Sequence, residues 1–183
     1  MSAICVYLSL PPYLAQWYAH TCRKARHRED DVCPNQPIPL LTPVEPVRSS
    51  YESQVLHRVL QKQPSAVPDP IPEDATLALA IPYYSDRDPR IFNYIGPHAK
   101  QELQNAILES FDICLWQELH SFRVRLNRQD EAIWSFMERH GIECMEANWN
   151  AVAKRYQRKR DIAYKINSRK KRSDSSRKNP KRY

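Results

Sequence analysis

The placement of proline limits this chain more than any other feature of its sequence. All fifteen prolines except Pro180 lie at or before Pro97, and none lies between His98 and Asn179. Proline removes a backbone N–H donor and clashes with the preceding helical turn, so it rarely lies inside a helix. We therefore predict short, interrupted elements in the first half of the chain and helices in the second.

Glycine is almost absent, and only Gly96 and Gly141 occur. Walker loops and GxGxxG dinucleotide sites need several glycines, so nucleotide-binding enzymes of these kinds are disfavoured. The 183 residues, of which 42% are hydrophobic, are enough for one domain or two small ones with a real core. No apolar run reaches the length of about 18 residues that a membrane-spanning helix needs, and the amino terminus lacks the basic residues of a secretory signal.

Residues 1–97 are predicted to form a small α+β unit of two short strands and two helices. Strand formers occupy residues 5–10 and 77–81. The first of these segments leads into a short helix expected at residues 12–20, where Pro12 suits the first turn. Ser49 and Glu52 have the spacing of a capping box for the second helix. We expect this proline-rich unit to serve dimerisation or partner docking. The side chains expected to face its core are Leu14, Trp17, Tyr18, Val55, Leu56, Val59 and Leu60.

The apolar spacing in residues 98–165 predicts a domain of four helices. The first covers residues 99–111, and Asp112 is expected to cap the second. The third is expected to end at Gly141 in the left-handed conformation that glycine tolerates, and the fourth covers residues 148–165. The expected fold class is therefore mainly α, with the small α+β unit preceding the helical domain.

The third and fourth helices are predicted to form a helix-turn-helix pair. Both have the i, i+3, i+4, i+7 spacing of a buried stripe, which in the third helix ends with His140 and in the fourth consists of apolar residues and Tyr156. The connecting segment GIECMEA exceeds the three or four residues that are usual, although a helix start at Glu146 would shorten it. The alternative is an ordinary helical hairpin with a charged outer face. The residues expected to form the core of the pair are Ile133, Phe136, Met137, Trp149, Val152, Ala153 and Tyr156.

The net charge of +7 is unevenly distributed. Residues 154–183 contain 14 of the 28 Lys and Arg residues but only two acidic ones, Asp161 and Asp174. The net charge of this end is therefore about +12. The remaining residues have 14 basic and 19 acidic side chains, so their net charge is about −5. Because an acidic body repels nucleic acid, any such binding must involve the carboxyl end. Residues 166–183 are expected to be a disordered basic tail.

Three segments also resemble a known family. They are VYLSLPPYLAQWY at residues 6–18, DPRIFNYIG at residues 88–96 and ERHGIECMEANWNAVAKRYQRKR at residues 138–160. They are similar to segments of small, mostly uncharacterised DNA-binding proteins from mobile elements and prophages of gut anaerobic bacteria. The resemblance covers most of residues 5–162, is densest in residues 136–160, and implies DNA binding without any established catalytic residue.

Helix geometry predicts how such binding would work. The fourth helix would lie in the major groove, where Asn150, Ala151 and Lys154 would meet base edges. Basic residues beside them would bind phosphates, so affinity would fall steeply with salt. The residues predicted to contact phosphates are Arg155, Arg158, Lys159, Arg160, Lys165, Arg125, Arg128, Arg169, Lys170, Lys171 and Arg172.

Other reactive residues give no comparable signal. His20, Cys22, His27 and Cys33 fit no common zinc-ligand spacing, and Cys144 has no evident His and Asp partners for nucleophilic catalysis. We therefore expect no metal site, no cofactor, no small-molecule substrate and no catalytic residues. The five cysteines are odd in number and irregularly spaced, which favours a reducing cytoplasm. The family resemblance implies that this cytoplasm is bacterial, where a DNA-binding protein would be associated with the nucleoid.

The predicted function is sequence-selective binding of duplex DNA, as a transcriptional regulator or a mobile-element accessory factor, without enzymatic activity. One alternative is an RNA-binding or single-strand-binding protein in which the basic tail dominates. Another is a protein-interaction scaffold. A small nuclease would need a set of carboxylate and histidine residues that the sequence does not indicate.

Overall fold

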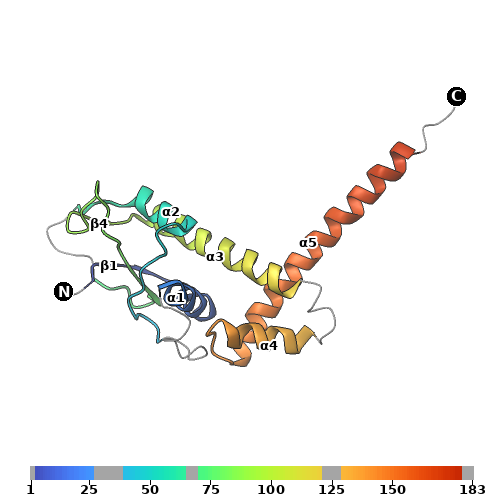
Figure 1. The fold of residues 1–183 in the computed structure, drawn as a ribbon, viewed down its shortest axis with the longest axis horizontal. Coiled ribbons are helices and arrows are strands. Elements are labelled where there is room, and N and C mark those ends of the chain that lie inside the picture. The colour runs from blue at the N-terminus through green and yellow to red at the C-terminus, as the bar shows by residue number, and fades with distance from the viewer. Residues whose placement is uncertain (1–2, 27–38, 65–69, 121–128, 179–183) are drawn as a thin grey trace.

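The computed structural model of the protein describes residues 3–26, 39–64, 70–120 and 129–178, and within them the chain is mainly α, as predicted (Figure 1). Two short antiparallel strand pairs accompany the helices near the amino terminus. The elements are β1 (Cys5–Leu8), α1 (Pro12–Arg26), α2 (Tyr51–Val59), β2 (Gln61–Lys62), β3 (Leu77–Ala80), β4 (Phe92–Tyr94), α3 (Pro97–Leu119), α4 (Gln129–Arg139) and α5 (Glu146–Lys178).

The two predicted strands exist and pair with each other. β1 and β3 run antiparallel, with Cys5 opposite Ala80 and Leu8 opposite Leu77. All four residues of β3 are buried, because β1 lies along one edge and Val44 bridges to the other. The pairing of β2 with β4 was not predicted, since segments of two and three residues are too short to show an alternating pattern.

The amino-terminal helices differ from the prediction at their ends. α1 continues to Arg26, six residues beyond the predicted end at His20, because the intervening residues include no proline or glycine. The cap of α2 is Ser50 instead of Ser49: its hydroxyl accepts a hydrogen bond from the Ser53 N–H at 3.2 Å. The core-facing residues predicted for both helices are all buried.

The helix prediction was most in error at α3. One helix covers Pro97–Leu119 where two were expected, so Asp112 lies inside it and does not cap a new one. No proline or glycine interrupts residues 98–119, and the buried stripe continues past Asp112. The described part of residues 98–165 therefore contains three helices in place of four. The fully buried residues on the stripe are Leu103, Ile107, Phe111 and Leu115.

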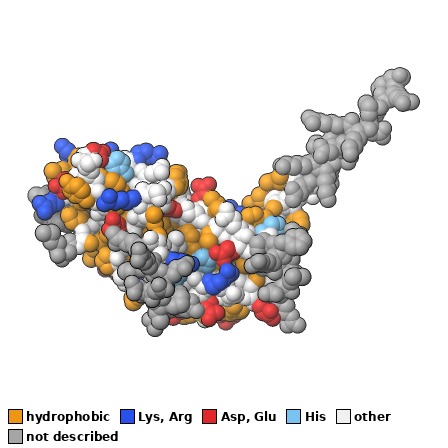
Figure 2. All heavy atoms as spheres, viewed as in Figure 1, with side chains coloured by type: hydrophobic (Ala, Val, Ile, Leu, Met, Phe, Trp, Pro, Cys, Tyr) orange, Lys and Arg blue, Asp and Glu red, His pale blue; other side chains and the backbone are white. Residues whose placement is uncertain are grey.

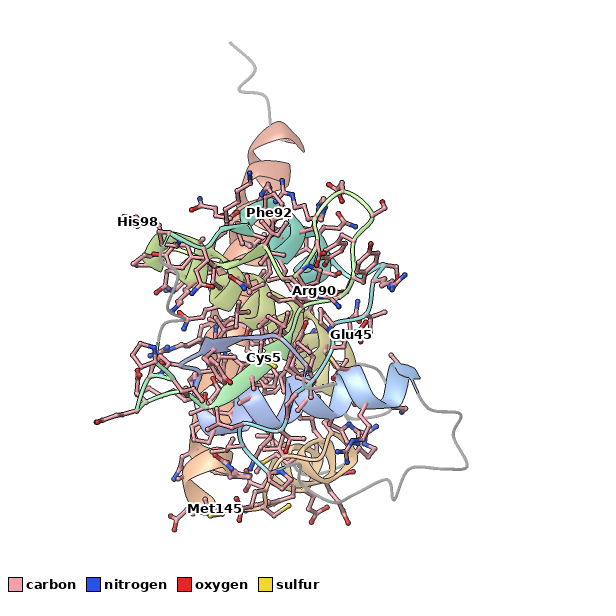
Figure 3. All side chains as sticks on the ribbon, turned by 90° about the vertical axis from the view of Figure 1, so that its left-hand side faces the viewer. Cys5, Glu45, Arg90, Phe92, His98 and Met145 are labelled. Carbon is pink, nitrogen blue, oxygen red and sulfur yellow. The ribbon has the colours of Figure 1, made fainter. Side chains whose placement is uncertain are left out.

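The buried side chains form one continuous core that includes residues on both sides of Pro97. α1, α2, α4 and α5 all pack against α3. Phe111 lies at the centre of this packing, with its ring edge-on to those of Trp17 on α1 (5.3 Å between centroids) and Phe136 on α4 (6.0 Å). Met145, just before α5, lies at the end of the body opposite Phe92 (Figure 3).

Gly141 ends the third predicted helix, α4, in the expected left-handed conformation, with φ at 62°. The Ile142 N–H donates to the Met137 carbonyl at 2.9 Å and the Gly141 N–H to that of Glu138 at 3.3 Å, which is the Schellman pattern. A side chain here would also collide with α1, because an added Cβ would lie 2.7 Å from Cδ2 of His20. Both the backbone and the packing therefore require glycine.

Replacing Gly141 with alanine should lower the free energy of unfolding by about 2–4 kcal/mol, from left-handed strain of about 1 kcal/mol and overpacking of about 1–3 kcal/mol. Urea unfolding followed by circular dichroism measures this loss. Gly96→Ala is the matched control: its φ is −68° and an added Cβ meets nothing within 4 Å, so we expect a change below about 0.5 kcal/mol. Equal losses in the two variants would contradict this account of Gly141.

Candidate nucleic-acid interface

α5 leaves the body of the protein partway along its length (Figure 1). Val152 and Tyr156 are buried, and the Tyr156 hydroxyl donates to the Leu119 carbonyl at 3.1 Å. Further along, Ile162 and Tyr164 are more than half exposed. Figure 2 shows hydrophobic side chains where the helix leaves the body. The carboxyl half of α5 thus extends away from the core that supports its amino half.

The helix is longer than predicted at both ends. It begins at Glu146, which shortens the connection to α4, and it continues to Lys178 instead of ending at Lys165. Most of the segment expected to be a disordered tail is thus helical, since the first proline after α4 is Pro180. Residues 179–183 lie outside the described part of the chain.

The predicted core of the α4–α5 pair is largely buried. Ile133, Phe136 and Met137 of α4 are fully buried, as is Val152 of α5, and Tyr156 is only 7% exposed. Trp149 and Ala153 are half-buried and pack against this core. The Trp149 ring stacks on that of Trp134, with 6.1 Å between centroids.

Two polar side chains that the sequence analysis did not identify fix the turn between α4 and α5. Asn148 is 5% exposed, and its Nδ2 donates to the Glu143 carbonyl at 3.0 Å. Gln16 of α1 accepts a hydrogen bond from the Glu143 N–H through Oε1, also at 3.0 Å. The position of Asn148, two residues after the start of α5, indicates that it could bond to the turn backbone. No sequence pattern predicts the contact of Gln16 with residue 143. The start of α5 is thereby tied to α1.

Two of the three predicted base-contacting residues are accessible. Asn150 and Lys154 are exposed and lie one turn apart on the same face of α5. Ala151 is half-buried and packs against the core, so it does not belong to the accessible surface. Glu143 and Glu146, both exposed, lie beside the start of the helix and would repel phosphates there.

Asp112 of α3 binds two of the residues predicted to contact phosphates. Arg155 donates from Nε to Oδ1 (2.5 Å) and from Nη2 to Oδ2 (3.1 Å), and Nζ of Lys159 lies 3.2 Å from Oδ2. The Asp112 side chain is only 9% exposed, and a carboxylate at this depth needs cationic partners to replace lost solvation. We therefore leave Arg155 and Lys159 out of the candidate contact surface.

The other predicted phosphate contacts differ in their surroundings. Arg158 and Lys165 are exposed. Arg160 is half-exposed, donates to Gln129 and lies about equally far from two tyrosine rings, 5.8 Å from that of Tyr156 and 5.9 Å from that of Tyr164. Arg125 and Arg128 lie outside the described residues. For the four predicted contacts beyond residue 168, only the helical backbone is described, namely for Arg169, Lys170, Lys171 and Arg172.

A different group of reactive side chains meets beside the α4–α5 junction. Cys114 and Glu118 of α3 lie one turn apart, and His140 follows α4; their ligand atoms are within 4.8 Å of one another. Local sequence patterns do not reveal this group, because they show only the i, i+4 spacing of Cys114 and Glu118. Of the dismissed zinc set, His20 and Cys22 are buried on α1, and the other two residues lie outside the described ranges.

The Cys114 group does not have the geometry of an activated nucleophile. Nε2 of His140 lies 2.7 Å from Glu118 Oε1, and because a carboxylate only accepts, that nitrogen carries a proton. The thiol lies 3.7 Å from the same carboxylate oxygen. Burial and the charge of Glu118 raise the pKa of Cys114 to about 11, so the thiol is protonated near neutral pH.

A pocket of about 540 Å³ adjoins this group. Its lining includes Trp17 and Cys22 of α1, Cys114 of α3, and His140 after α4. The lining also contains imidazole and hydroxyl groups and two charged side chains, Lys24 and Glu52. No helix in the described ranges is long and apolar enough to cross a bilayer.

No family model, curated protein or solved structure matches this chain. The resemblance of residues 138–160 to DNA-binding proteins of mobile elements therefore stays a prediction. What the chain binds has to be inferred from the charge and exposure of its own residues.

Asp112→Asn should lower the free energy of unfolding by about 2 kcal/mol, because it leaves two cations without a counter-charge. Breaking a buried pair costs about 3–5 kcal/mol, and the partial exposure of Arg155 and Lys159 reduces that cost. Glu109→Gln, at an exposed position of the same helix, is the control and should change stability by less than about 0.5 kcal/mol. If both variants unfold at the wild-type urea concentration, the ion pair does not stabilise α5 on α3.

Proposed function

We propose that the protein binds duplex DNA through the exposed face and the projecting part of α5. The observation that carries this proposal is that α5 extends away from the body (Figure 1). By sequence, its carboxyl part is basic, whereas residues 1–153 have a net charge of about −5. Residues 160–178 contain eight basic and two acidic side chains and extend for about 28 Å. A single helix of this kind fits the major groove, which is about 12 Å wide.

Helical periodicity places the exposed candidate contacts on one face of α5. At about 100° per residue, positions 150, 154, 158 and 165 fall within one narrow arc of α5, and all four side chains are exposed. Positions 169 and 172, both arginine, continue the same arc along the helical backbone. Asp161 is the acidic exception on this face, and it accepts a hydrogen bond from Gln157 at 2.9 Å. Phosphates and base edges in one groove would meet this arc.

The charge distribution also favours an orientation. The carboxylates of Glu143 and Glu146 flank the start of α5, so DNA phosphates would approach the carboxyl half more closely. In this mode Arg158 and Lys165 bind phosphates, while Asn150 and Lys154 reach base edges near the body. The contact surface is thus shifted along the helix from that of a usual helix-turn-helix protein, which uses the amino end.

Arg158→Gln combined with Lys165→Gln should weaken DNA binding and flatten its salt dependence. Each lost phosphate contact lowers the slope of log affinity against log salt by about 0.9, so the pair lowers it by about 1.8. Fluorescence anisotropy with a labelled duplex over a salt series measures both quantities. Arg23→Gln with Lys24→Gln removes the same charge from exposed positions of α1 and should leave the slope unchanged.

Two outcomes of this experiment would contradict the proposal. One is an equal loss in the α1 control, which would indicate only general attraction to positive charge. The other is tighter binding of a matched single strand or RNA duplex than of the DNA duplex, which would favour the RNA-binding alternative.

Lys154→Ala should weaken binding to a selected DNA sequence more than binding to DNA of unrelated sequence. With a site selected from a random duplex pool, a lost base contact should cost about 1–3 kcal/mol, while binding to a scrambled duplex changes less. Asn150→Ala should behave alike. Equal losses on the selected and scrambled duplexes would make Lys154 a phosphate contact and leave the protein without base recognition at this position.

A further inference from the structure

Three side chains with metal-binding atoms converge where α4 meets α3. Sγ of Cys114 lies 3.7 Å from Oε1 of Glu118 and 4.0 Å from Nε2 of His140, and the latter two atoms are 2.7 Å apart. Both neighbours therefore face the same nitrogen of the imidazole. A proton relay would use the two ring nitrogens for two different partners, whereas ligands of one ion all point at one position.

The separations are close to those of a tetrahedral zinc site. With bonds of about 2.0–2.1 Å to nitrogen and oxygen and about 2.3 Å to sulfur, adjacent ligand atoms lie roughly 3.3 Å apart for nitrogen and oxygen and roughly 3.6 Å apart when one is sulfur. The Cys114 distances exceed these values by less than about 0.5 Å, and the distance from Glu118 to His140 is shorter by about 0.6 Å. Small side-chain rotations correct differences of this size.

The surroundings orient the Glu118 carboxylate and shield the group partly from water. Nη2 of Arg139 lies 3.0 Å from Oε2 of Glu118, which leaves Oε1 directed at the group. The Glu118 and His140 side chains are 30% and 18% exposed, so water reaches them only in part. A charged partner on the second oxygen of a ligating carboxylate resembles the outer-shell arrangement of metal sites.

We propose that Cys114, Glu118 and His140 form a binding site for Zn²⁺ or a similar divalent transition-metal ion. The thiolate, one carboxylate oxygen and Nε2 of the neutral imidazole are the ligands, and solvent takes the fourth position. On binding, the thiol proton and the Nε2 proton leave to solvent or to Nδ1. The two ligand charges then neutralise the ion.

The ion would cross-link α3 to the end of α4 just before the Gly141 turn. Affinity should rise with pH, because the proton on the Cys114 thiol has to be displaced. This site is independent of the DNA-binding proposal, since none of its three ligands belongs to the exposed face of α5.

Titration of the reduced full-length protein with Co²⁺ tests the site. We expect one Co²⁺ per chain, with the thiolate charge-transfer band in the near ultraviolet and the intense visible bands of tetrahedral cobalt, all lost when Zn²⁺ is added. Cys114→Ser should abolish the charge-transfer band. The matched control, Cys144→Ser, removes an exposed thiol outside the group and should leave the spectrum unchanged.

Arg139→Gln keeps all three ligands and removes the charged partner of Glu118, so it should weaken Co²⁺ binding about 10–100-fold without unfolding the protein. No charge-transfer band in the wild-type protein would overturn the proposal. A band that persists in Cys114→Ser would also overturn it, because another cysteine would then be the ligand. Circular dichroism of each variant separates loss of the site from loss of the fold.

Discussion

The buried face of α3 is the constraint on which the rest of the structure depends. Every other helix packs against it, and Phe111 at its centre contacts aromatic rings of both α1 and α4. Apolar burial of this kind is the main favourable term in folding. The proline-rich first half contributes α1, α2 and the β1–β3 pair to the same core, so its short elements are held by the helix that follows them.

Asp112 adjoins that apolar face. The basic residues of α5 fall into two groups, those that contact Asp112 and those that do not. Arg155 and Lys159 neutralise the buried carboxylate and attach α5 to α3. Arg158 and Lys165 have exposed side chains and are available to a polyanion. A positive residue on an amphipathic helix therefore has a structural or a binding role according to what lies opposite it in the fold.

Contacts at the junction of α4 and α5 position the start of the projecting helix. Gly141 allows a close approach of His20, while Gln16 and Asn148 satisfy the backbone of the turn. The Cys114, Glu118 and His140 group lies at the same junction. Several independent contacts thus position the start of α5, and the direction of its free end follows from them.

The sequence by itself determined the helical second half, the two strands, the glycine stop at residue 141 and the buried stripes of α4 and α5. These features depend on local rules: proline and glycine chemistry and the periodicity of apolar residues. Only the tertiary structure decided that Asp112 binds Arg155 and that Cys114 and Glu118 meet His140. Such pairings join residues 22 to 43 positions apart, where no local pattern operates, because packing alone sets which side chains meet.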